Sequence, residues 1–310
     1  MTLLLSLLLA APVISPADSV RSLVTVASVP ERALLFAELA ARMEGGGAGV
    51  ELASLLELAG EFSDARRQYD LMLASDPGDE LRSWLVDRSR GSAAVDTQLV
   101  LDATVVNRGD EPVRDLELMM PLPRDHPPYQ RLEIVESAMR LNGSVLTGRI
   151  GELEPGGRRH FRVVLRLRQV PGSFRPLPDT VGSLELSALL AEARSASDAE
   201  GGDGWGPCLA MARELRTRLA GRLDLEVVGG VVRRGDSLVF HAWNMVADGP
   251  CEGMPVDPLL LSEDSLRGIG HCPTDLIPLW NLLSTGGNEL SLVCPAGTPG
   301  LSIGLSARLR

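Results

Sequence analysis

The spacing of apolar residues changes near residue 93, and this change constrains the fold more than any other feature of the sequence. Before it, apolar residues recur at helical spacing, as at 33–39 and 69–73, which is typical of amphipathic helices. After it, apolar and polar residues alternate, as at 97–106 and 116–120, which is typical of strands with one buried face. We therefore expect a multidomain α+β protein, with a helical region first and strands after it.

Turn residues divide the alternating part of the chain into short strands. The segments 107–112 and 153–157 are rich in the residues that form tight turns. Between 161 and 168 apolar residues alternate with arginines, which we expect on a solvent face. The pattern favours an Ig-like β-sandwich, and the proline-rich stretch 121–130 is expected to cap a strand and shield a sheet edge.

A stretch rich in proline, serine, alanine and glycine follows the sandwich pattern, interrupted by an apolar piece at 184–191 that predicts a short helix. The chain beyond it alternates helix and strand patterns, so we expect a third unit of α+β type. The expected units are a signal peptide at 1–17, a helical region at 18–91, the Ig-like sandwich at 92–172, a linker at 173–203 and the third unit at 204–310.

Composition and the first residues bear on location and partners. A net charge of -11 argues against a sequence-independent nucleic-acid binder, because phosphate neutralisation needs a basic surface. Residues 1–17 form an apolar run that ends in small residues, as in secretory signal peptides. The alternatives are a buried N-terminal helix or a membrane anchor, and no later segment reaches spanning length. We expect a secreted or periplasmic protein.

One part of the helical region carries a family likeness. The run from Leu56 to Ala65, followed by Tyr69 and the Asp76-Pro77 turn, resembles a tetratricopeptide repeat. The resemblance implies two helices joined at a glycine and packed closely at a small alanine. One good unit is visible, whereas stacked repeats need several. We therefore expect a small helical bundle that offers a docking surface to a protein partner.

The chain contains four cysteines, at positions 208, 251, 272 and 294. Export makes disulfides possible. If Cys208 is kept as a free thiol, the simplest division is one pair and one spare, and Cys251 with Cys272 is the expected pair because the loop between them is short and rich in turn residues. The chain has no close cysteine pair, so we expect neither a zinc site nor a cofactor.

Cys208 stands at the predicted start of a helix. Pro207 suits the first helical position and Gly221 suits the end, which predicts a helix from Cys208 to Ala220. At that end the helix dipole is positive and favours the thiolate, the form that attacks carbonyl carbon. The alternative is that Cys208 is a small core residue, which is the commoner fate of cysteine.

Two later residues supply partners for such a thiol. His241 lies in the middle of a predicted strand at 237–246, where a structural strand prefers a β-branched or aromatic residue. An imidazole beside a thiol can take its proton and return it to a leaving group. Asp257 precedes Pro258 and can hold the imidazole in the right tautomer, although Asp before Pro is often a turn residue. Trp243 is expected to pack beside His241, and Asn244 to bond in the cleft or at a strand end.

The order of these residues is similar to that of the transglutaminase-like superfamily, including its bacterial cysteine-peptidase-like members. The likeness covers about 204–261 and rests on the cysteine at a helix start, a strand approach at 218–230, His-Ala-Trp-Asn at 241–244 and Pro-Val-Asp-Pro at 255–258. Pro207 departs from it, because the family often has a small polar residue there.

The resemblance implies a papain-like fold in which Cys208 is the nucleophile, His241 the general base and acid, and Asp257 the orienting group. A protein or peptide substrate would be cut or transferred at an amide bond through a thioester, resolved by water or by an amine. The Cys208 backbone N–H and the Trp205 indole are candidate oxyanion donors, although Trp205 can equally be a lid or core aromatic. The competing expectation is a catalytically silent protein used for binding or scaffolding.

Overall fold

The computed structural model describes residues 48–173, 207–259, 268–282, 291–293 and 300–310. Of these residues, 25% are helical and 48% lie in strands, which confirms the α+β class. The predicted signal peptide at 1–17, the helix at 184–191, Trp205 and Cys294 lie outside the described residues. Among the described helices, none combines the length and the hydropathy that a membrane crossing requires.

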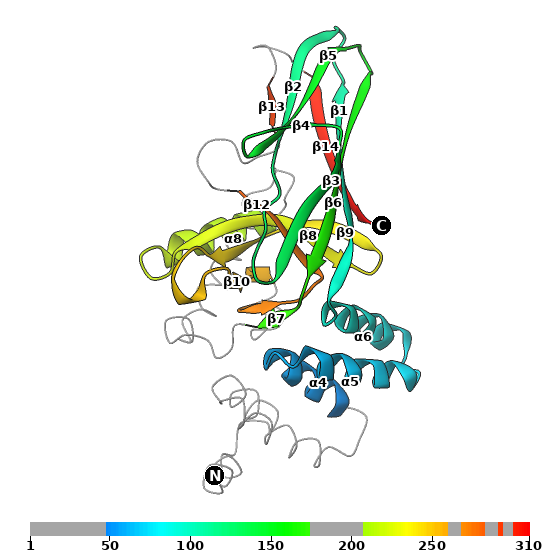
Figure 1. Cartoon of the computed structure of the whole chain (residues 1–310), viewed down its shortest axis with the longest axis vertical. Coiled ribbons are helices and arrows are strands. Elements are labelled where there is room, and N and C mark those ends of the chain that lie inside the picture. The colour runs from blue at the N-terminus through cyan, green and yellow to red at the C-terminus, as the bar shows by residue number, and fades with distance from the viewer. Residues whose placement is uncertain (1–47, 174–206, 260–267, 283–290, 294–299) are drawn as a thin grey trace, which may run out of the picture.

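Three helices form the N-terminal region and pack around a small core of their own (Figure 1). They are α4 (Ala48–Leu58), α5 (Phe62–Ala74) and α6 (Asp79–Gly91). Gly60 has a φ of 86° in the turn between α4 and α5, a conformation that glycine adopts without strain. Tyr69 and Leu85 are fully buried between the helices, and Tyr69 meets Trp84 edge to face with ring centroids 5.9 Å apart. The apolar spacing read from the sequence therefore corresponds to a real helical core.

Two antiparallel sheets face each other above this region and enclose one continuous apolar core (Figure 1). The first sheet has the order β14-β1-β6-β3 and the second β13-β2-β5-β4. Their bounds are β1 (Val95–Asn107), β2 (Val113–Pro121), β3 (Gln130–Ser137), β4 (Arg140–Asn142), β5 (Val145–Leu153), β6 (Arg158–Gln169), β13 (Ser291–Val293) and β14 (Leu301–Leu309). The alternation at 97–106, 116–120 and 161–168 therefore falls on β1, β2 and β6, as expected.

The end of the chain belongs to this pair of sheets, which differs from the expected division at residue 204. Strand β14 pairs with β1 so that Leu305 lies opposite Ala103, and β13 pairs with β2. Ile303, Leu305 and Ala307 pack against the shared core. The edge of β1 accepts β14 because the two strands have matching alternation, which places the apolar residues of β14 on the core face.

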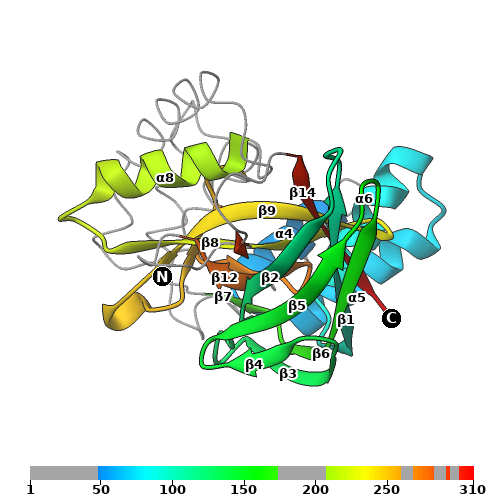
Figure 2. The same cartoon turned by 90° about the horizontal axis from the view of Figure 1, so that it is seen from above.

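A third sheet, of order β10-β9-β8-β12, lies across the base of the sandwich. Its strands are β8 (Leu225–Arg234), β9 (Ser237–Val246), β10 (Pro255–Val256) and β12 (Leu276–Asn281). Helix α8 (Pro207–Leu219) runs alongside β9 and β8 (Figure 2). Small elements complete the unit: the 3-10 helix η1 (Gly249–Cys251), and β7 (Gly172–Ser173) paired with β11 (His271–Cys272).

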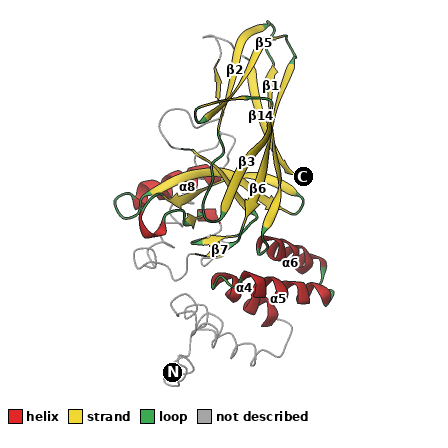
Figure 3. Ribbon diagram, viewed as in Figure 1, coloured by secondary structure: helices red, strands yellow, loops and turns green. Residues whose placement is uncertain are grey.

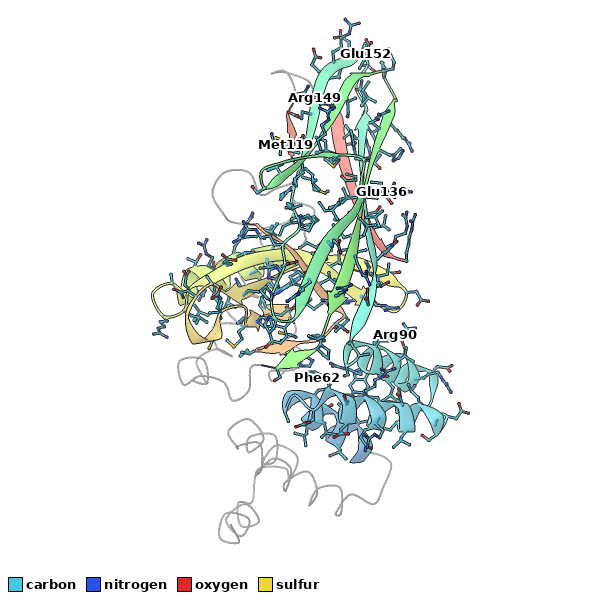
Figure 4. The ribbon with its side chains drawn as sticks, in the orientation of Figure 1. Phe62, Arg90, Met119, Glu136, Arg149 and Glu152 are labelled. Carbon is cyan, nitrogen blue, oxygen red and sulfur yellow. The ribbon has the colours of Figure 1, made fainter. Side chains whose placement is uncertain are left out.

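Side-chain contacts join the three regions. Gln130 at the start of β3 donates a hydrogen bond from Nε2 to the Pro278 carbonyl at 2.6 Å, and Gln169 at the end of β6 donates to that of Leu276 at 2.9 Å. Both bonds tie the sandwich base to β12. At the helical end, Phe62 stacks on His271 with ring centroids 5.9 Å apart. Helices α4, α5 and α6 lie on the side of the sheets opposite the β2–β5 tip, whereas α8 lies beside the third sheet (Figure 3). Phe62 and Arg90 lie on the side of the three helices that meets the sheets (Figure 4).

The expected disulfide between Cys251 and Cys272 is wrong, because both thiols are free. Cys251 is buried with Leu215 and Val246 on the side of the third sheet that α8 covers. Cys272 lies in β11 and lines a small cavity with Trp243 on the other side. The two cysteines are near in sequence, but Cys251 lies in η1 and Cys272 in β11, on opposite sides of the sheet.

Candidate active site

Cys208 is the second residue of α8, which begins at Pro207 rather than at the expected Cys208. The apolar face of the helix holds it in place, since Leu209 and Ala212 are buried in the main core. The Cys208 side chain is half-buried at the rim of this core and its thiol is free. Because the first N–H groups of a helix have no partner within it, the positive end of α8 lies at the thiol.

His241 lies in the middle of β9, in the strand that its sequence predicts. It pairs with Gly230 of β8 on one side. On the other side β10 pairs with β9 only at Asn244 and Met245, so among the described strands His241 is at a sheet edge. Its ring stacks on Trp243 with centroids 5.6 Å apart and an interplanar angle of 23°, which confirms the expected packing. The His241 imidazole is thus packed against an aromatic ring, and His241 is 6% exposed. It lies at a sheet edge, where residues from outside the sheet can contact it.

Asp257 follows β10 and brings its carboxylate to that edge. Its Oδ2 atom lies 2.7 Å from His241 Nε2. The Leu259 backbone N–H donates to its other oxygen at 2.9 Å, and the Asp257 backbone N–H donates to the Gly268 carbonyl at 2.7 Å. Asp257 is 2% exposed, so these bonds fix a buried carboxylate in one orientation toward the imidazole. A free turn residue would not be held in this way.

The electrostatics of His241 reflect both neighbours. Burial alone lowers the pKa of His241, but hydrogen bonds to Asp257 and Cys208, together with their negative charge, raise it to about 9. Asp257 Oδ2 lies beside Nε2, which leaves Nδ1 as the ring nitrogen available to Cys208. The structure therefore brings together Cys208, His241 and Asp257, in that order along one imidazole. A protonated imidazole is the form that can give a proton to a leaving group.

Asn244 connects α8, which carries Cys208, to β9, which carries His241. Its Nδ2 atom donates to the Ala212 carbonyl in α8 at 2.9 Å, and the residue is fully buried. This bond links β9 to α8 within a few residues of His241 and Cys208. Neither a cleft contact nor a strand-end contact, the two expectations for Asn244, describes it. The sequence signal was a polar residue on the same strand face as Ala242 and Val246, both of which are buried.

No known protein family matches this sequence in a scan of family models, and no curated protein matches it.

Two further expectations concern the oxyanion donors and a metal site. Trp205 lies outside the described residues, so of the two candidate oxyanion donors the structure describes only the Cys208 backbone N–H. Within the described part of the chain, no three His, Cys, Asp or Glu side chains gather as they would around a metal ion.

Proposed function

We propose that this protein is a transglutaminase-like cysteine hydrolase or acyltransferase acting on peptide or amide bonds. The observation that carries the proposal is the His241 imidazole, which is bonded at Nε2 to a buried carboxylate and whose pKa is raised by Asp257 and by the neighbouring thiol of Cys208. Three residues from three separate elements meet there, in the arrangement that nucleophilic catalysis by cysteine requires.

The reaction would proceed in two halves. The Cys208 thiolate attacks the carbonyl carbon and forms a C–S bond, while the carbonyl electrons move to oxygen. The C–N bond then breaks as the His241 imidazolium gives its Nδ1 proton to the leaving nitrogen. This leaves a thioester on Cys208 and a neutral imidazole, which Asp257 holds in place through Nε2.

In the second half, water or an amine attacks the thioester. His241 takes a proton from the attacking group at Nδ1, and the C–S bond breaks to release an acid or a new amide. The thiolate and the imidazolium are restored as a pair. Stabilisation of the oxyanion falls to the Cys208 backbone N–H, with the Trp205 indole as the second proposed donor.

The wider architecture fits the same proposal. We assign α8 and the β10-β9-β8-β12 sheet to a papain-like core, the two facing sheets to an Ig-like sandwich, and the three helices to a docking surface for a protein partner. Secretion or periplasmic location follows from the proposed signal peptide at 1–17.

The deciding experiment follows alkylation of each cysteine by iodoacetamide with peptide mass spectrometry, across about pH 5 to 9. In the full chain, Cys208 should react rapidly at the acidic end, and His241→Ala should abolish this advantage. Equal reactivity of Cys208 in both proteins would refute the dyad. The same preparations are then given glutamine-containing peptides, and ammonia and new peptide termini are measured. An activated Cys208 that releases neither product would favour the silent, binding alternative.

A further inference from the structure

A small cavity lies between the sandwich base and the third sheet, on the side away from α8. Its volume is about 30 Å³, and a cavity of roughly 10–15 Å³ on this measure already holds one water molecule. The walls come from the sandwich through His126 and Tyr129, from β9 through Trp243 and Met245, and from β11 through Cys272. Three segments of the chain therefore line one space of the size of a water molecule or two.

Two polar atoms in the walls have no partner within the described part of the protein. They are Nε1 of Trp243 and Nε2 of His126, and both are shielded from solvent. Trp243 is 0% exposed, and its indole nitrogen can only donate. Burial, with a smaller effect of the Arg124 charge, lowers the pKa of His126 to about 4. At neutral pH this imidazole is uncharged, so one of its nitrogens is an acceptor.

We propose that a water molecule in this cavity accepts the Trp243 Nε1–H and donates to His126 Nε2, and that this bridge positions the indole on which His241 stacks. Trp243 and His126 are then positioning residues for the catalytic imidazole, a role that rests on the proposed function. The water satisfies both buried atoms, with one hydrogen bond accepted and one donated.

The contacts of Trp243 explain why the bridge matters. The six-membered ring of the Trp243 indole is closely packed, because a Cβ added at Gly230 would lie 2.6 Å from Trp243 Cη2. Gly230 is also the cross-strand partner of His241. The six-membered ring is thus confined by the sheet, whereas the indole N–H, which has no partner among the described residues, belongs to a residue that lines the cavity. A tilt of the indole about its confined end would carry the stacked His241 ring away from Cys208.

His126 is itself fixed by the sandwich. Its backbone N–H donates to the Gln130 carbonyl at 3.0 Å, and the side chain of Gln130 bonds to β12. The proline-rich stretch 121–130, expected to cap a strand, therefore also places the His126 imidazole in the wall of the cavity that Trp243 lines. Through this residue the sandwich acts on the geometry of the third sheet.

The test uses the full chain and three variants. His126→Leu removes the acceptor, His126→Gln keeps an amide group near the position of Nε2, and Trp243→Phe removes the indole N–H. His160→Leu is the matched control, because His160 is exposed on the sandwich and bonds only to Thr104 among its described side-chain partners. Thermal unfolding of each variant shows that it is folded before the other readouts are taken.

The first readout is independent of catalysis. A crystal structure of the wild-type chain should show an ordered water between Trp243 and His126, and the Trp243 indole N–H should exchange slowly by NMR. In His126→Leu the exchange should become at least about tenfold faster, while His126→Gln keeps it slow. A dry cavity, or unchanged exchange in His126→Leu, would overturn the bridge.

The second readout is the pH profile of Cys208 alkylation. His126→Leu and Trp243→Phe should lower the rate near neutral pH by about tenfold, since small displacements of a catalytic group have effects of this order. His126→Gln and His160→Leu should keep the wild-type profile. A wild-type profile in a folded His126→Leu protein would overturn the positioning role. If wild-type Cys208 shows no His241-dependent activation at all, the proposed function has failed, and the crystallographic water still decides the bridge by itself.

Discussion

Asn244 on β9 donates a hydrogen bond to the Ala212 carbonyl on α8, with 2.9 Å between the two atoms. Ala212 lies four residues after Cys208, about one helical turn, and Asn244 lies three residues after His241. One buried bond therefore fixes the spacing between the strand that carries the imidazole and the helix that carries the thiol.

Asn244→Leu should separate these elements and destabilise the fold. It removes a fully buried donor and forces a larger apolar group against α8, so the free energy of unfolding should fall by about 1–3 kcal/mol. Urea denaturation gives this value. Asn142→Leu, at an exposed position in β4, should change it by less than about 0.5 kcal/mol. A neutral effect of Asn244→Leu would mean that the bond does not set the spacing.

Asp257→Asn should reduce the activation of Cys208 without unfolding the protein. The amide can keep the bond from Leu259 N–H, but it removes the negative charge that helps to raise the pKa of His241. We expect Cys208 alkylation near pH 6 to slow by about tenfold or more. The matched control is Asp248→Asn, an exposed carboxylate at the N-cap of η1. Equal rates in the two variants would remove Asp257 from the site.

The pH dependence of stability should report the raised pKa of His241. Its ordinary value is 6.5 and its folded value about 9, so the folded protein keeps a proton that the unfolded chain releases first. The resulting stabilisation is complete below pH 6.5 and disappears as the pH rises through about 9. Urea unfolding of wild type and of His241→Gln should therefore differ most at the acidic end of this window and converge above it. A constant difference across the window would contradict the assignment.

Gly230→Ala should be strongly destabilising. The added methyl group would collide with the Ile277 carbonyl and lie 2.6 Å from Trp243 Cη2, so we expect a loss of about 3 kcal/mol or more. Displacement of Trp243 should also slow Cys208 alkylation. Gly304→Ala is the control, because no atom lies within 4 Å of its added Cβ. If both variants unfold at the same urea concentration, Trp243 is less confined than its contacts indicate.

Local patterns predicted much of the secondary structure. Alternation over 97–106 corresponds to β1 and the run at 237–246 to β9, and Pro207 with Gly221 bracketed α8 to within a residue or two. These features depend on side-chain period, on the fixed φ of proline and on the freedom of glycine, all of which act within a few residues. The residues named for the site, Cys208, His241 and Asp257, could be chosen from the sequence because their side-chain chemistry and their order along the chain are both visible there.

Tertiary structure alone decided which of these pieces meet. Tertiary contacts bring together residues that no local pattern relates: Asp257 with His241, β14 with β1, and His126 with Trp243 around one cavity. The same packing leaves Cys251 and Cys272 as free thiols. Each depends on which apolar faces bury one another and on the sheet edges left open for pairing. The sequence by itself determined the elements and the reactive groups on them. Packing decided that the Cys208 thiol and the Asp257 carboxylate share the imidazole of His241.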